Sequence, residues 1–99
     1  MKPTYVIDGD SFSDLSGFAR HFSSIALKEY EWRGNLDAFN DILRGGFGTP
    51  DGGFILIWRK HEKSIDSLGQ DLFATLIEII RTHGAEGEEA EDGVELQLC

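Results

Sequence analysis

The chain has 99 residues and a formal net charge of −9, a size that suits one domain around one modest core. Hydrophobic residues make up 40% of it, which excludes a disordered composition, and no apolar run is long enough to span a bilayer. The negative charge argues against direct binding of nucleic acid and suits a basic protein partner or simple solubility. We therefore expect a single domain over residues 1–99 that is a monomer when free.

The first predicted element is a strand over residues 4–7, where TYVI is rich in strand-forming residues and a DGD turn follows. Its apolar stretch is too short for the core of a signal peptide, so we expect a cytoplasmic protein. The single cysteine, Cys99, has no partner for an internal disulfide, which agrees with a reducing compartment.

Two predicted helices follow, each with apolar residues at helical spacing. The first has Ser11 or Ser13 as its candidate N-cap and Asp14 in its first turn. Its apolar stripe consists of Leu15, Phe18, Phe22 and Ile25. The second helix has Asn35 as its N-cap and ends at Gly45-Gly46, where left-handed backbone is cheap. Its stripe consists of Leu36, Phe39 and Leu43, with Ile42 beside them.

A glycine-rich loop over residues 45–53 separates these helices from a second strand, FILIW at 54–58. Five apolar residues without alternation are typical of a strand that is buried on both faces. We therefore expect residues 54–58 to form the central strand of a sheet, with at least four of the five side chains buried.

The polar segment over residues 59–69 predicts a short helix or turn, and the apolar residues from 72 to 80 predict a longer helix that ends at Gly84. The alternating sequence at 94–98 predicts an edge strand with one solvated face. Helical crossovers are what parallel strands need. The predicted fold class is therefore α/β: two layers, with a three-stranded parallel sheet in the order 1-2-3 and about four helices.

The segment EGEEAED, residues 86–92, holds five acids and no base. Its like charges repel one another, and it has almost no apolar surface to bury. We expect a mobile acidic loop that contributes nothing to folding.

The sequence contains no recognisable catalytic or metal-binding pattern. His21, His61 and His83 are far apart, and neither the spacing of a zinc site nor a phosphate-binding glycine loop occurs. The DGD turn could ligate a metal, but such a sequence after a strand is more often a plain turn. We expect no catalytic residues, no bound metal and no cofactor, and we interpret the protein as a non-enzyme.

Two aspartates of the predicted second helix, Asp37 and Asp41, stand four residues apart and share one helix face, where like charges are mildly destabilising. The helix dipole favours Asp37 in the first turn, and Arg44 could pair with Asp41. A solvated acidic face explains this pattern without any function. A catalytic acid–base pair is an alternative that would need a cleft in which the two pKa values differ.

The stretch NLDAFNDIL, residues 35–43, resembles the hallmark motif of the barstar family of small intracellular ribonuclease inhibitors. That motif is Asn-Leu-Asp-Ala, two variable positions, then Asp and an apolar pair. VIDG near the start and LIWR at 56–59 are similar to the family's first strand with its turn and to its second strand. The resemblance extends over nearly the whole chain. It implies a barstar-like fold and the function of an immunity protein that blocks a secreted or toxin ribonuclease.

In the family, the second helix and the loop before it plug the active site of the nuclease. The resemblance therefore implies that Asp37 and Asp41 enter that site, Asp41 as the main mimic of the substrate phosphate, and that Asn35 fixes the helix start. Trp32 is a candidate aromatic anchor for the partner, or else it packs against the protein's own helices. We expect both carboxylates to be exposed and without a committed salt-bridge partner.

Several positions depart from the family pattern. Relative to the family's prototype, Glu31 and Trp32 stand in place of two tyrosines, Asn40 and Arg44 stand in place of a tryptophan and a threonine, and the glycine at Gly45 is kept. These changes indicate the same inhibitory mode against a different nuclease, or a function that has drifted. The expected partner-binding residues are Trp32, Asn35, Asp37, Asn40, Asp41, Arg44 and Gly45.

The expected partner of such an inhibitor is a basic ribonuclease, with no direct contact to nucleic acid or membrane. A different class of function stays open: a small acidic metal-dependent hydrolase, or an enzyme subunit, that uses Asp8, Asp10 and the aspartate pair. A titration of the pure protein with divalent metal ions would separate the two classes, because only the hydrolase needs a tight metal site.

Overall fold

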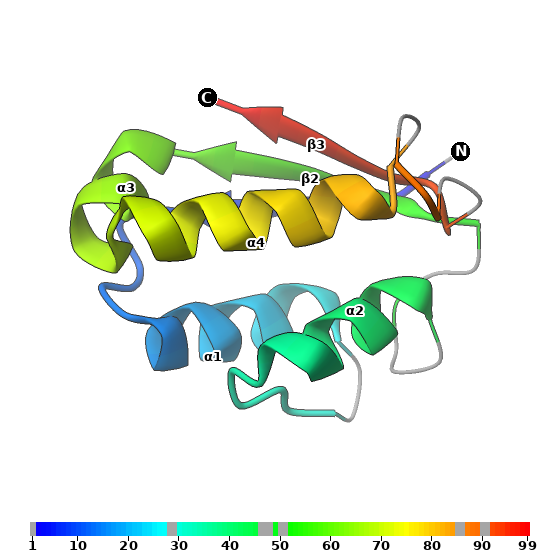
Figure 1. The fold of residues 1–99 in the computed structure, drawn as a ribbon, viewed down its shortest axis with the longest axis horizontal. Helices are drawn as coiled ribbons and strands as arrows, with labels where there is room; N and C mark the ends of the chain where they lie inside the picture. Colours follow the sequence, from blue (N-terminus) through cyan, green and yellow to red (C-terminus); the bar gives the residue numbers. More distant parts are fainter. Residues whose placement is uncertain (1, 28–29, 46–48, 50–51, 85–86, 90–91) are drawn as a thin grey trace.

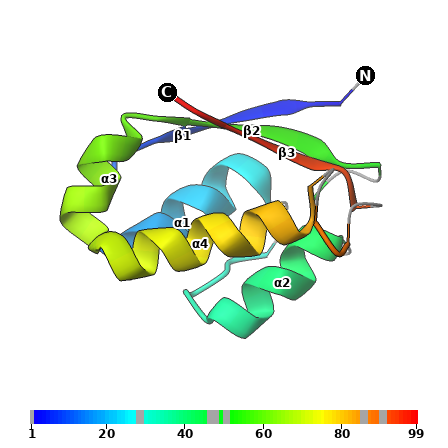
Figure 2. The same cartoon turned by 45° about the horizontal axis from the view of Figure 1, so that its top comes forward.

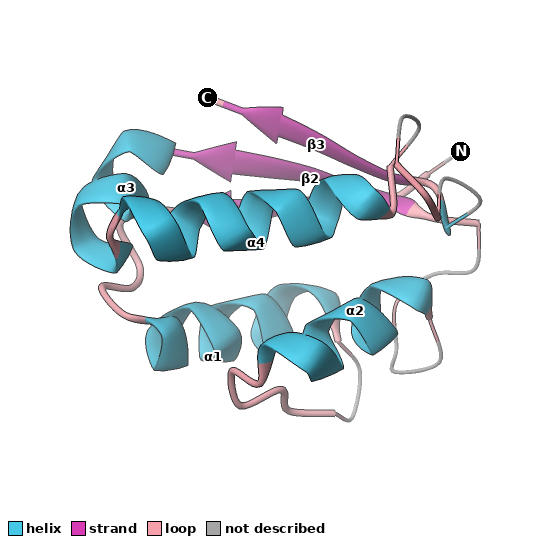
Figure 3. Ribbon diagram, in the orientation of Figure 1, coloured by secondary structure: helices cyan, strands magenta, loops and turns pink. Residues whose placement is uncertain are grey.

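The computed structural model describes residues 2–27, 30–45, 49, 52–84, 87–89 and 92–99. Its elements follow the predicted order of strand, two helices, strand, two helices and strand (Figures 1 and 3). The strands are β1 (Thr4–Asp8), β2 (Phe54–Arg59) and β3 (Val94–Leu98). The helices are α1 (Leu15–Ala26), α2 (Leu36–Arg44), α3 (His61–Leu68) and α4 (Gln70–Thr82).

The three strands form one parallel sheet in the order β1-β2-β3, with β2 in the centre. All four helices lie on the same side of this sheet (Figure 2). The predicted fold class, a two-layer α/β arrangement with a three-stranded parallel sheet, is thus confirmed. Within the described ranges, no helix is both long and apolar enough to cross a membrane.

The burial of β2 differs from the prediction. Phe54, Leu56 and Trp58 are buried, with no more than 1% of each exposed, but Ile55 and Ile57 are only partly buried. Alternate side chains of a strand point to opposite faces, and the helices cover only one face of the sheet. The central position of β2 was predicted correctly, whereas the expectation of at least four buried side chains was wrong.

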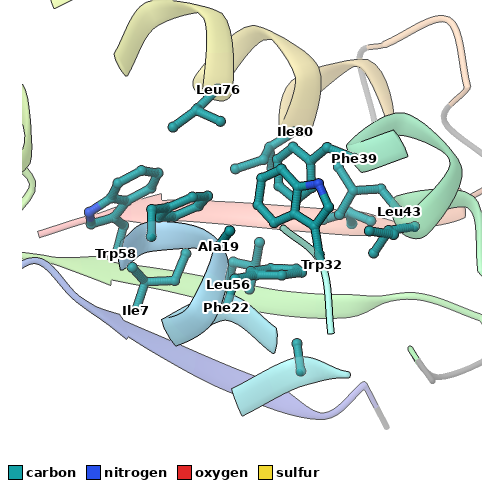
Figure 4. Packing of buried hydrophobic residues seen from close by; sticks show 14 of the residues in the cluster. Ile7, Ala19, Phe22, Trp32, Phe39, Leu43, Leu56, Trp58, Leu76 and Ile80 are labelled. Atoms are coloured by element: carbon teal, nitrogen blue, oxygen red, sulfur yellow. The ribbon is translucent and has the colours of Figure 1, made fainter. Parts of the chain in front are cut away.

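Aromatic rings fill the space between the sheet and the helices (Figure 4). Phe18 of α1 stacks on Trp58 of β2 with 5.1 Å between ring centroids. Trp32 stacks on Phe39 of α2 with 4.5 Å between centroids, and Phe22 meets Phe39 edge-on. These contacts join β2, α1 and α2 into one apolar core, so the position of α2 is set by packing.

The ends of the first two helices follow local chemistry. The N-cap of α1 is Asp14, whose Oδ1 accepts a hydrogen bond from the backbone N–H of Gly17 at 2.7 Å, so Ser11 and Ser13 were the wrong candidates. Helix α2 ends at Gly45 as predicted, with a φ of 113° that favours glycine. Most of the glycine-rich loop that follows, residues 46–48 and 50–51, lies outside the described residues.

Candidate functional site

Helix α2 has an apolar side and an acidic side. Phe39, Ile42 and Leu43 are buried, with no more than 2% of each exposed, whereas Asp37 and Asp41 are exposed. The burial of one side fixes the direction in which the other side points. The predicted exposure of both carboxylates is confirmed. Among the described residues Asp37 forms no ion pair, and it lies in the first turn of α2 as predicted.

The start of α2 is held by Asn35 and Trp32. The Asn35 side chain accepts a hydrogen bond from the backbone N–H of Ala38 at 3.1 Å, which confirms the predicted N-cap. The Trp32 indole N–H donates to the backbone carbonyl of Asn35 at 2.8 Å. The cap residue is therefore itself fixed from the core side.

Trp32 belongs to the core, where only 1% of the residue is exposed. Its backbone N–H donates to the hydroxyl of Ser23 at 2.9 Å, and that hydroxyl donates to the carbonyl of Ala19 at 2.7 Å. Trp32 is thus held by the stacking of its ring on Phe39, by the hydrogen bond of its indole to Asn35 and by the hydrogen bond of its backbone to Ser23. Of the two interpretations of Trp32, packing against the protein's own helices is the one that the structure shows, and the ring is not presented as an anchor.

An ion-pair cluster lies at the C-terminal end of α2. The Arg44 guanidinium donates through Nη1 to Asp41 Oδ1 at 2.8 Å, and through Nε and Nη2 to the two carboxylate oxygens of Glu89 at 2.6 and 2.9 Å. The expectation that Asp41 has no salt-bridge partner was therefore wrong. Hydrogen bonds from Arg44 lower the pKa of Glu89, and the Glu89 carboxylate in turn raises the pKa of Arg44.

A buried histidine connects α2 to Asp92 of the acidic segment, which is the predicted loop over residues 86–92. His83, with 0% of the residue exposed, has Nε2 3.1 Å from Asn40 Oδ1 and Nδ1 2.6 Å from Asp92 Oδ2. The predicted loop thus has two residues, Glu89 and Asp92, in contact with the fold, while the expectation that the loop contributes nothing to folding stays a prediction. Residues 86, 90 and 91 lie outside the described residues.

His83, Glu89 and Asp92 also have potential metal-ligand atoms within 4.8 Å of one another. Each of these side chains already has a protein partner, since Arg44 binds Glu89 and the imidazole lies against the carboxylate of Asp92. The sequence search missed the group because no metal-ligand spacing relates its members. The two carboxylates are therefore already engaged by side chains of the protein itself.

The two remaining aspartates of the hydrolase hypothesis lie elsewhere. The Asp8 carboxylate, at the end of β1, accepts a hydrogen bond from the backbone N–H of Asp10, which lowers the pKa of Asp8. Asp10 forms ion pairs with Lys60 and Lys63 at the start of α3, and the Lys60 hydrogen bond is the main cause of its lowered pKa. The carboxyl end of β1 lies near α3, whereas α2 ends near the C-terminus of α4 (Figure 2). The four aspartates therefore do not gather into one site.

The sequence matches the family model described as Barstar (barnase inhibitor) over residues 2–99, essentially the whole chain. The chain belongs to the barstar family. No curated protein gives a significant match. The resemblance found in NLDAFNDIL and in the element order is thus confirmed at the level of the family.

Two of the expected partner-binding residues on α2 have structural partners within this chain. Asn40 faces His83, and Arg44 pairs with Asp41 and Glu89. Gly45, another of these expected residues, ends α2. Asn40 and Arg44 therefore contact residues that follow α4, and local sequence patterns gave no sign of this.

Proposed function

We propose that this chain inhibits a barnase-type ribonuclease by placing the acidic side of α2 in the active site of that enzyme. The supporting observation is that Asp37 and Asp41 are exposed on a helix whose other side is locked into the core. A ribonuclease active site gathers arginine, lysine and histidine to hold a phosphodiester. Carboxylates on a rigid helix can accept the same charge-assisted hydrogen bonds.

The mechanism is one of binding, without a chemical step. Asn35 and Trp32 fix the start of α2, so little conformational entropy is lost when the carboxylates meet their partner. The net charge of −9 attracts a basic protein over distances of about a Debye length, roughly 10 Å at 0.1 M salt. In this proposal the protein is a non-enzymatic immunity protein that acts in the cytoplasm.

The test is inhibition of a panel of barnase-type ribonucleases in a fluorogenic RNA cleavage assay, with wild type, Asp41→Ala and Asp37→Ala. Because each change leaves cationic groups of the nuclease unpaired, each should weaken binding by about 2–5 kcal/mol. Stability should stay within about 0.5 kcal/mol of wild type for Asp41→Ala, since the position is exposed.

Asp66→Ala is the matched control, because Asp66 is an exposed aspartate on α3 and its removal changes the net charge equally. It should alter affinity only slightly. The proposal is wrong if Asp41→Ala and Asp66→Ala have the same small effect on inhibition, or if the wild-type protein inhibits none of the ribonucleases.

A further inference from the structure

We propose that Glu89 keeps one carboxylate oxygen of Asp41 open to a cation of the partner, because it holds Arg44 so that the guanidinium meets Asp41 through a single hydrogen bond. This inference rests on the proposed function, in which Asp41 receives a guanidinium or ammonium group of a basic protein. It assigns to the acidic segment after α4 a role in setting the affinity of α2, and it makes Glu89 a positioning residue.

Arg44 forms more hydrogen bonds with Glu89 than with Asp41. The guanidinium meets both carboxylate oxygens of Glu89, through Nε and Nη2, but meets Asp41 through Nη1 and Oδ1 alone. Two parallel hydrogen bonds orient a guanidinium better than one. With Glu89 in place, Oδ2 of Asp41 has no partner among the described residues.

Backbone hydrogen bonds fix the position of Glu89. Its N–H donates to the carbonyl of Thr82, the last residue of α4, at 2.9 Å, and its own carbonyl accepts from the N–H of Asp92 at 3.1 Å. Gly87 approaches the same carbonyl so closely that a Cβ on it would lie 2.2 Å from the oxygen of Thr82. Asp92 is held in turn by buried His83. The segment therefore presents Glu89 at a defined place beside α2.

The charges of the cluster leave room for one more cation. Asp41 and Glu89 carry two negative charges, and Arg44 supplies a single positive charge between them. A guanidinium from a partner, bound at Asp41, would complete an alternating row of four charges. Without Glu89, Arg44 could turn both donors of its fork onto Asp41, and the partner would have to displace it.

The experiment compares four variants with wild type: Glu89→Gln, Glu88→Gln, Arg44→Gln and the double variant Arg44→Gln/Glu89→Gln. Glu88 is the control, since it is the exposed neighbour of Glu89 and its change alters the net charge equally. Two probes are used, a barnase-type ribonuclease that the wild type inhibits and a labelled hexa-arginine peptide at low salt. Unfolding curves check that each variant folds.

With both probes, Glu89→Gln should bind at least about fivefold more weakly than wild type, and Glu88→Gln should stay within about twofold. Arg44→Gln should bind no more weakly than wild type, because the competitor for Asp41 is removed. The double variant has the same net charge as the wild type, and it should bind each probe at least as tightly as the wild type does.

The inference is overturned if Glu89→Gln and Glu88→Gln have equal effects, or if the double variant remains as weak as Glu89→Gln, since Glu89 would then contact the partner directly. If no ribonuclease is bound by the wild type, the proposed function fails, and the peptide series alone decides whether Glu89 governs the access of a cation to Asp41.

Discussion

The two sides of α2 obey different constraints. On the inner side Phe39, Ile42 and Leu43 are buried, and Phe39 packs against aromatic rings of α1 and of the segment before α2. On the outer side Asp37 and Asp41 stay in solvent, and Asp41 shares Arg44 with Glu89. Substitutions on the inner side should therefore change stability, whereas substitutions on the outer side should change binding and the response to acid.

The largest effect is expected from Phe39→Ala. The side chain is fully buried and stacks on Trp32, so its removal leaves a cavity and should cost about 3–5 kcal/mol of unfolding free energy. Denaturant unfolding followed by tryptophan fluorescence measures it. A loss below about 1 kcal/mol would show that the stability of the protein does not depend on the inner side of α2.

The sheet offers the same division between a covered and an open face, and β2 tests it. Leu56 is fully buried beneath the helices, whereas Ile57 is only partly buried on the open face. Leu56→Ala should cost about 2–5 kcal/mol, and Ile57→Ala should cost clearly less, because less apolar surface is removed from contact. Equal losses in denaturant unfolding would show that burial alone does not separate the two faces.

Local patterns were enough to predict the elements and the acidic side of α2. Helical spacing predicted the inner stripe, and the side-chain chemistry of Asn35 and the backbone freedom of Gly45 predicted both ends of the helix. The exposure of Asp37 and Asp41 follows from the same periodicity, because residues opposite a buried stripe face solvent.

The contacts of the acidic segment could not be predicted in this way. Glu89 is 45 residues from Arg44 and His83 is 43 residues from Asn40, so their pairing depends on how α2 and α4 pack. The prediction that at least four side chains of β2 are buried was wrong for a similar reason. An apolar strand does not reveal whether helices cover one face of the sheet or both, and here they cover one.

A smaller effect is expected at the N-cap of α2, which supports both the inner and the outer side of the helix. Asn35→Ala removes the acceptor for the N–H of Ala38 and should cost about 1 kcal/mol of stability. Under the proposed function it should also weaken inhibition slightly, since the first turn carries Asp37. Asn35→Ser keeps a capping oxygen and serves as the control, with stability near that of wild type. Equal stability of both variants would show that the cap contributes nothing.

The smallest effect is the response of the charged side to acid. Hydrogen bonds from Arg44 hold the pKa of Glu89 below its ordinary value of 4.5. A carboxyl whose pKa is lower in the folded than in the unfolded protein adds stability above the unfolded pKa, and this stability is lost as the pH falls through the folded pKa. In the pH range below 4.5, wild type should therefore lose stability more steeply than Arg44→Gln, in which Glu89 has lost this partner.

Unfolding free energies measured from about pH 5 to about pH 3 give the two slopes. The slope of Arg44→Gln should be reduced and not abolished, because hydrogen bonds also lower the pKa values of Asp8 and Asp10. Ile42→Val, on the inner side of α2, is the control: it should lower stability by about 0.5–1.5 kcal/mol at every pH and leave the slope unchanged. Parallel curves for wild type and Arg44→Gln would remove the distinction, since the charged side of α2 would then add no more pH dependence than the apolar side.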